Sequence, residues 1–213
     1  MKRIKYLEQN QIVKTLTTLI TLFNIQLAAQ NLADESDPPH LFLKDLPYLS
    51  EEQSGYDDYA ADRCKLDVYI PTNAQNASTV VWFHGGGLRS GQKHIPDRLK
   101  NQDMIIVAPN YRMFPKIKSP VYIQDAAAAV AWVFKHISEY GGNPDLIYIS
   151  GHSAGGYLAS MVGLDKQWLS LHSIDANAIA GLIPFSGHTI THFTVRQERG
   201  ISGEQPIIDS LAP

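Results

Sequence analysis

A five-residue motif that joins a buried strand to a helix is the feature that most constrains this chain. The apolar run Leu-Ile-Tyr-Ile-Ser at 146–150 predicts a buried strand, and Gly-His-Ser-Ala-Gly at 151–155 follows it without a break. A helix is expected from about Ala154 to Gly163. The pattern G-x-S-x-G between a strand and a helix is typical of a sharp turn that holds the serine clear of the sheet. We therefore expect Ser153 to project from this turn at the positive N-terminus of the helix.

The rest of the chain alternates between strand and helix patterns. Short apolar runs of the kind buried on both faces of a sheet recur along it, and one long segment repeats apolar residues at intervals of three and four. Strands that alternate with helices imply crossover connections, so we predict an α/β protein whose mostly parallel sheet is flanked by helices. Strands are expected at 65–70, 79–83, 104–108, 146–150 and 179–185, and helices at 121–140 and 154–163.

A glycine loop, residues 84–87 (His-Gly-Gly-Gly), follows the predicted strand 79–83. Glycines let backbone amides point at one place without a Cβ in the way, which suits a site that stabilises a developing oxyanion. We assign the oxyanion donors to the amides of Gly86, Gly87 and Ala154, and supporting roles to His84, Gly85, Gly151 and Gly155. A phosphate-binding loop is excluded, because the sequence has no G-x-x-x-x-G-K-[ST] and no G-x-G-x-x-G that opens a helix.

Composition narrows the function further. The formal net charge is −3 and basic residues are scattered past the N-terminus, so nothing predicts a nucleic-acid partner. Cys64 is the only cysteine, which excludes an internal disulfide and a cysteine-based zinc site, and we expect it to be a packing residue. No metal is expected.

The N-terminus has the marks of a targeting segment. Basic residues precede an apolar run at 16–27, with small residues after it, as in a secretory signal peptide. The run is too short and too polar to span a bilayer stably. We predict a signal peptide at 1–29, a leader or linker at 30–58, and the α/β domain at 59–213. This predicts a periplasmic or secreted protein, with the cytoplasm as the alternative.

The pairing of H-G-G-G with G-H-S-A-G-G resembles the α/β-hydrolase serine carboxylesterases, of the hormone-sensitive-lipase-like or feruloyl-esterase-like type. The resemblance covers residues 60–213 and includes Lys-Leu-Asp-Val-Tyr at 65–69, Asn-Tyr-Arg at 110–112 and Asp125. It implies that Ser153 attacks a small-molecule carboxylic ester and forms an acyl-enzyme that water releases, without a cofactor. An amidase or formamidase-like activity is an alternative within the same family.

The same resemblance implies a catalytic acid and then a histidine after the serine. The last predicted strand ends near Phe185 and the sequence ends at Pro213, so we expect an N-terminal fragment that lacks both groups. Asp175 with His188 or His192 keeps the required order, but Asp175 precedes its strand instead of following it. The alternative is that the chain is an inactive truncated remnant or a binding module.

Several other residues are assigned structural roles. His152 is held on the turn itself and is not expected to reach the serine hydroxyl as a base, while His84 is expected to brace its own loop. Arg112 and Asp125 are predicted to form an internal ion pair. Trp82, Trp132 and Phe134 are predicted core residues. An incomplete sheet would leave an apolar edge, which predicts poor solubility of the isolated chain.

Overall fold

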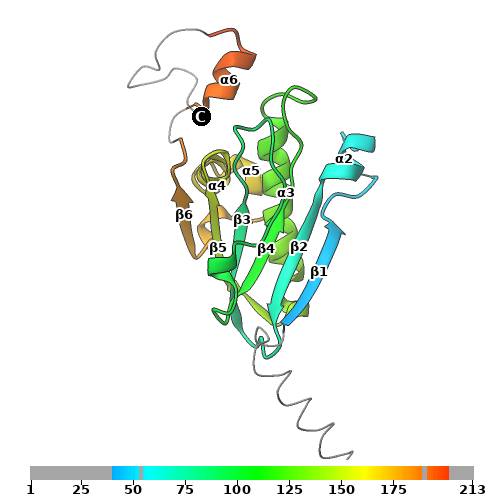
Figure 1. Cartoon of the computed structure of the whole chain (residues 1–213), viewed down its shortest axis with the longest axis vertical. Helices are drawn as coiled ribbons and strands as arrows, with labels where there is room; N and C mark the ends of the chain where they lie inside the picture. The colour runs from blue at the N-terminus through cyan, green and yellow to red at the C-terminus, as the bar shows by residue number, and fades with distance from the viewer. Residues whose placement is uncertain (1–39, 53–54, 189–190, 202–213) are drawn as a thin grey trace, which may run out of the picture. The chain divides into compact units, whose positions relative to one another are not determined.

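A six-stranded mixed sheet forms the centre of the computed structural model, which describes residues 40–52, 55–188 and 191–201 (Figure 1). The strand order is β1-β2-β4-β3-β5-β6. Strands β4, β3, β5 and β6 are parallel, whereas β2 pairs antiparallel with both β1 and β4. The strands are β1 (His40–Pro47), β2 (Lys65–Pro71), β3 (Ala77–Phe83), β4 (Ile105–Pro109), β5 (Gly142–His152) and β6 (Gly181–Phe185). All five predicted strands are present, and the predicted signal peptide lies outside the described residues.

Strand β1 lies inside the segment predicted to be a linker. It pairs with β2 from His40–Pro71 to Pro47–Lys65, and helix α2 (Asp58–Arg63) then leads into β2. The structure thus places a strand at 40–47 and the start of a helix at Asp58 inside the predicted linker at 30–58, so the sheet begins before the predicted domain start at 59. The strand escaped prediction because it is a mostly exposed edge strand, so it has no continuous apolar run.

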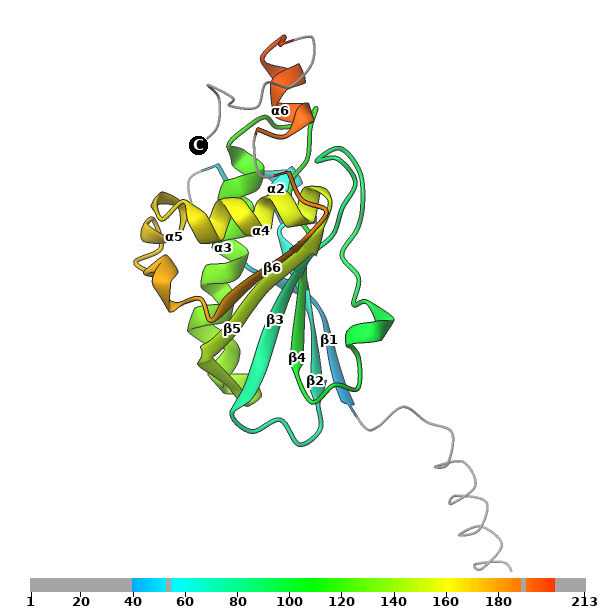
Figure 2. The same cartoon turned by 90° about the vertical axis from the view of Figure 1, so that its left-hand side faces the viewer.

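The larger helices cover one face of the sheet (Figure 2). The predicted long helix is α3 (Val121–His136), which continues as the short helix η2 (Ile137–Tyr140) and ends at Gly141, whose φ is 83°. Helix α4 (Ala154–Leu164) and the short α5 (Gln167–Ser170) follow β5. On the other face lies the single turn η1 (Asp97–Leu99), with Ile95 and Leu99 packed on the sheet.

Side chains of the central strands alternate between these two faces. Val81 and Phe83 of β3 enter the core beneath the helices, whereas Val80 and Trp82 face the side of η1. The buried alanines 126–129 and 131 of α3 let that helix lie close to the sheet. The tightly packed centre of the sheet thus provides a rigid support for the loops at the carboxyl ends of β3 and β5.

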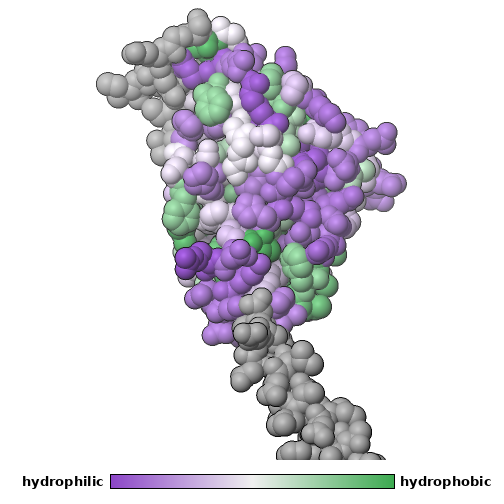
Figure 3. Space-filling view, in the orientation of Figure 1, coloured by the Kyte–Doolittle hydropathy of each residue, from purple (hydrophilic) through white to green (hydrophobic). Residues whose placement is uncertain are grey.

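The edge strand β6 exposes apolar side chains. Ile183 is 45% exposed and Phe185 is 51% exposed, and both lie on the face opposite α3 and α4. Figure 3 shows hydrophobic residues along the margin where β6 lies. Two short elements flank this strand, η3 (Ala176–Ala178) before it and α6 (Phe193–Glu198) after it.

The residues predicted to be core packing residues differ in how deeply they are buried. Cys64 is buried in the main core beneath the helices. Trp82, Trp132 and Phe134 are only partly buried, and each packs against the core from its margin. Large aromatic rings at the margin of a core are common, because such rings are rarely enclosed on all sides.

The helices of the described segments were compared with the length and apolar character that a membrane span needs. None of them is long and apolar enough to cross a membrane. The described residues also contain no group of three or more His, Cys, Asp or Glu side chains arranged to hold a metal ion.

Candidate active site

Ser153 lies at the tip of a strained turn between β5 and α4. Its backbone has φ 56° and ψ −116°, a conformation that side-chain-bearing residues rarely adopt. A Cβ on Gly155 would lie 2.0 Å from the Phe83 carbonyl oxygen, and one on Gly151 would lie 2.6 Å from the same oxygen. Both glycines of the G-x-S-x-G motif are therefore required by the close approach of α4 to the ends of β3 and β5.

The serine hydroxyl is available at this turn. The Ser153 amide donates a 2.8 Å hydrogen bond to the carbonyl of Phe185 in β6, which holds the backbone of the turn. The side chain caps no helix amide and forms no hydrogen bond with another described residue. The hydroxyl thus stands partly exposed at the N-terminus of α4, where the helix dipole favours negative charge.

The glycine loop lies directly beside this turn. A Cβ built on Gly85 would be 3.4 Å from the Ser153 Cβ and 2.9 Å from the His152 carbonyl oxygen. Gly86 and Gly87 have φ values of 115° and 64°, in the region that favours glycine. The structure therefore brings together the two motifs that the sequence separates.

Hydrogen bonds to the loop carbonyls fix the directions of the loop amides. The Gly86 carbonyl accepts from the amides of Arg89 and Ser90, each at 3.1 Å. Because N–H and C=O point in opposite directions across a trans peptide, the Gly87 amide faces away from these two donors. The amides of Gly86, Gly87 and Ala154 donate to no other described backbone carbonyl. Within the described residues, all three predicted oxyanion donors are therefore unengaged.

The His84 ring braces the loop from below. Its Nδ1 lies 2.7 Å from the Gly85 carbonyl oxygen, and the ring stacks on Tyr111 with centroids 4.4 Å apart. The Tyr111 hydroxyl donates to the His84 carbonyl at 2.8 Å. Burial lowers the pKa of His84 to about 4, so the ring is neutral at pH 7 and donates through Nδ1. This geometry suits a supporting residue and not a proton carrier.

A buried arginine that the sequence did not single out binds the chain a few residues after the glycine loop. Arg63, at the end of α2, donates from Nε to the Tyr111 carbonyl and from Nη2 to the Gly91 carbonyl, each at 3.2 Å. It is 5% exposed. No sequence signal identifies it, because its partners are backbone atoms of distant segments.

His192, the last histidine of the chain, is not arranged as a base for the serine. His192 is fully buried, and its Nδ1 accepts the Thr194 amide at 3.1 Å. A triad base needs that nitrogen to donate to a carboxylate, so His192 has the wrong hydrogen-bond partner. Burial, followed by the charge of His188, lowers the pKa of His192 to about 4.

Asp175 lies at the wrong end of the sheet. It caps η3, where its side chain accepts from the Asn177 amide, and this short helix precedes β6. The end of β6 that meets the turn is Phe185, paired with His152. Five strand residues span about 15 Å, so Asp175 does not orient a base at Ser153. Among the described residues, no carboxylate is thus seen to orient a histidine towards the Ser153 hydroxyl.

The predicted ion pair of Arg112 and Asp125 is present. The guanidinium meets both carboxylate oxygens, at 2.9 and 2.7 Å, and Asp125 also accepts the Arg112 amide at 2.9 Å. Asp125 is 1% exposed. This pair ties the segment after β4 to α3 and so supports the loops above the sheet.

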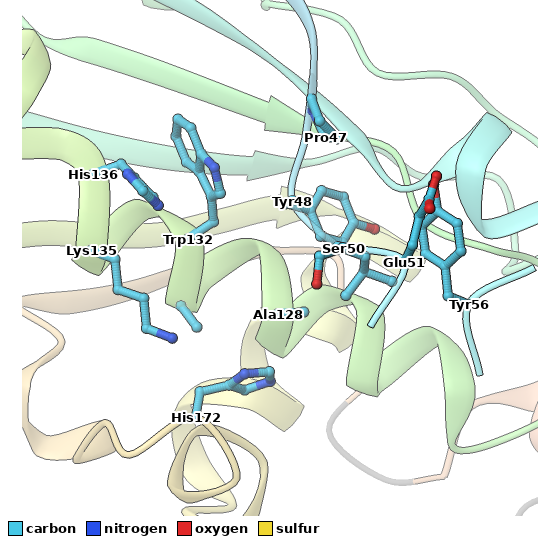
Figure 4. Close-up of a pocket in the computed structure, with 12 residues that line it drawn as sticks. Pro47, Tyr48, Ser50, Glu51, Tyr56, Ala128, Trp132, Lys135, His136 and His172 are labelled. Atoms are coloured by element: carbon cyan, nitrogen blue, oxygen red, sulfur yellow. The ribbon is translucent and has the colours of Figure 1, made fainter. Parts of the chain in front are cut away.

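A cavity of about 650 Å³ lies elsewhere, between segment 47–51 and the C-terminal half of α3 (Figure 4). Tyr48, Trp132 and Ala128 form its apolar part, with Lys135 and His172 at its polar side. Neither Ser153 nor the glycine loop lines it. Its size alone does not make it the candidate active site, which is defined by the contact between the Ser153 turn and the glycine loop.

The fold is that of the α/β hydrolases. The chain superposes on the crystal structure of esterase B from Lactobacillus rhamnosis with a TM-score of 0.58 and 22% identity, covering 83% of this chain and 58% of that one. Within this fold class the chain belongs to the BD-FAE family, whose model matches residues 66–187, more than half of the sequence.

Two relatives from Mycobacterium tuberculosis are similar in sequence. The chain is 30% identical over 145 residues to carboxylesterase NlhH, covering 65% of this chain and 44% of that protein. It is 48% identical over 79 residues to the probable carboxylic ester hydrolase LipM, covering 37% and 18%. The chain thus spans less than half of the length of these curated relatives.

Proposed function

We propose that Ser153 is the nucleophile of a carboxylic ester hydrolase that works through an acyl-enzyme. The amides of Gly86, Gly87 and Ala154 form its oxyanion site in this proposal. The observation that carries the proposal is the contact between the Ser153 turn and the glycine loop, with a would-be Gly85 Cβ 3.4 Å from the Ser153 Cβ. The names of the relatives, carboxylesterase and carboxylic ester hydrolase, support the same chemistry. The substrate class is a small-molecule ester.

In the proposed reaction, the Ser153 oxygen attacks the ester carbonyl carbon while a base removes the hydroxyl proton. The carbonyl oxygen becomes an oxyanion, which the amides of Gly86, Gly87 and Ala154 stabilise. Collapse of the tetrahedral intermediate releases the alcohol, which takes the proton from the base. Water then attacks the acyl-serine while the same base removes its proton, and collapse of this second intermediate releases the acid as the Ser153 oxygen takes the proton back from the base.

The base in this proposal comes from outside the described residues. The eight histidines of the chain fall within the described ranges, and none hydrogen-bonds the Ser153 hydroxyl. His192 is buried with Nδ1 facing a backbone amide, and His84 is held beneath the loop. A serine without a base is a poor nucleophile at neutral pH, so the 213-residue chain alone should react slowly.

Chemical rescue tests this proposal. Hydrolysis of p-nitrophenyl butyrate is measured for the chain and for Ser153→Ala, with and without added imidazole as an external base. The proposal predicts slow turnover by the chain, and with imidazole a clear gain beyond the hydrolysis that imidazole alone catalyses. Ser153→Ala should show neither. Equal rates for the two proteins under both conditions would support the inactive remnant or binding module instead.

The matching amide substrate separates the remaining alternative. Hydrolysis of p-nitrobutyranilide, measured in parallel, should stay far below that of the ester. A preference for the anilide would favour the amidase or formamidase-like activity.

We also propose export through a signal peptide at 1–29. The basic start and the apolar run of the sequence support this. Amino-terminal sequencing of the protein from its own cells should begin near residue 30, and a start at residue 1 or 2 would contradict export.

A further inference from the structure

Helix α6 lies against the glycine loop although more than a hundred residues separate them in the sequence. Hydrogen bonds to several segments help to anchor this helix. The Arg89 guanidinium donates to Gln197, and Glu198 accepts the Ser119 amide at 2.8 Å and the Tyr122 hydroxyl at 3.4 Å. A further contact joins Thr194 to Gly87 of the glycine loop itself.

The Thr194 hydroxyl donates a 2.6 Å hydrogen bond to the Gly87 carbonyl. Thr194 is fully buried, and its own amide is bound by His192 Nδ1. The neighbouring Phe193 ring covers the same glycine, since a Cβ on Gly87 would lie 3.1 Å from the Phe193 Cζ. Gly87 is therefore held from the side of α6 by one hydrogen bond and one ring.

The glycines of this loop need such restraint. Without a Cβ, the peptide planes on either side of Gly87 can turn with little steric hindrance. The Gly86 carbonyl is fixed by Arg89 and Ser90, which restrains the plane before Gly87. The plane after Gly87 is restrained by Thr194. The Gly87 amide belongs to the plane before Gly87, and the bond from Thr194 limits the rotation at the Gly87 Cα that would let this plane turn against the next one.

We propose that Thr194 is a positioning residue for the oxyanion site, an inference that rests on the proposed ester hydrolysis. Thr194 does not touch the reacting atoms. It acts through Gly87, whose amide must already point at the oxyanion when the charge develops, because preorganisation is what makes such donors effective. Loss of the Thr194 hydroxyl should weaken transition-state stabilisation without loosening the substrate site as a whole.

Three variants separate positioning from simple anchoring of α6. Thr194→Val keeps the shape and removes the hydroxyl, whereas Thr194→Ser keeps the hydroxyl. Gln197→Ala is the matched control, because it removes a different contact of α6, with Arg89 two residues after the glycine loop. The rate of Ser153 labelling by a fluorophosphonate in the presence of imidazole is measured for each full-length variant, together with amide hydrogen exchange of segment 84–90.

The inference predicts labelling about tenfold slower for Thr194→Val, with Thr194→Ser and Gln197→Ala within about twofold of the parent. Amide exchange in 84–90 should rise in Thr194→Val alone. Unchanged exchange and labelling in Thr194→Val would overturn the inference, as would an equal effect of Gln197→Ala. If the parent itself is not labelled at Ser153, the proposed function fails. The exchange data then decide separately whether Thr194 orders the loop.

Discussion

A Cβ at Gly155 would lie 2.0 Å from the carbonyl oxygen of Phe83. This contact would join a Cβ, which is fixed to the backbone, to a backbone oxygen, so no side-chain rotation could relieve it. The contact is also what lets α4 start directly above the end of β3, and it therefore fixes where Ser153 stands.

Gly155→Ala should consequently destabilise the protein by about 3 kcal/mol or more, measured by urea unfolding, because overpacking against backbone is poorly relieved. Gly163→Ala is the control on the same helix, since the three atoms nearest to its new Cβ would all belong to the flexible Leu182 side chain. That control should change the free energy of unfolding by less than about 1.5 kcal/mol. Equal effects of the two substitutions would contradict the packing explanation.

The buried ion pair of Arg112 and Asp125 should be costly to break. Asp125→Asn leaves the Arg112 charge without its bidentate partner, and a loss of about 3–5 kcal/mol in the free energy of unfolding is expected. Asp97→Asn removes the exposed pair with Lys100 and should have no measurable effect. A small effect of Asp125→Asn would mean that water reaches the guanidinium.

Stability should fall as the pH is lowered from about 6.5 towards 4. The lowered pKa values of His84 and His192, each about 4, mean that the unfolded state binds protons at these side chains before the folded state does. His192→Asn keeps an acceptor for the Thr194 amide but removes one titrating group. Its free energy of unfolding should depend less steeply on pH within this window.

Above pH 7 both histidines are neutral in both states, so the wild type and His192→Asn should respond alike. Chemical denaturation at a series of pH values measures both regions. A slope in the lower window that is the same for both proteins would show that His192 is not responsible.

The apolar margin of β6 should cause self-association of the 213-residue chain. Ile183 is 45% exposed on an edge strand, where a lysine commonly blocks edge-to-edge pairing. Ile183→Lys should therefore lower the aggregated fraction in size-exclusion chromatography. Leu171→Lys, at a site 69% exposed outside the sheet, should lower it less. A monodisperse parent chain would contradict this expectation.

The buried strands and the turn motif were predictable because their signals are local. The run at 146–150 and the motif after it contain the strand, the glycines and the serine in one stretch of sequence. The edge strand β1 was missed, since exposure removes the apolar pattern that identifies a strand. Antiparallel pairing of β2 likewise depends on partners far along the chain.

The supports of the candidate site were the least predictable part. Arg63 and Thr194 act on backbone carbonyls of the glycine loop and its continuation from distant elements. A hydrogen bond to a main-chain atom places no demand on the partner's side chain. Such contacts leave no paired pattern in a single sequence, in contrast to the charged pair Arg112–Asp125.

The most direct test of the nucleophile is covalent labelling with a fluorophosphonate, followed by intact mass and peptide mapping of the full chain with imidazole present. A serine that projects beside free loop amides should form one phosphonyl adduct, on the peptide that contains Ser153, and Ser153→Ala should form none. An unmodified chain, or an adduct confined to another serine, would contradict the assignment of Ser153 as the nucleophile.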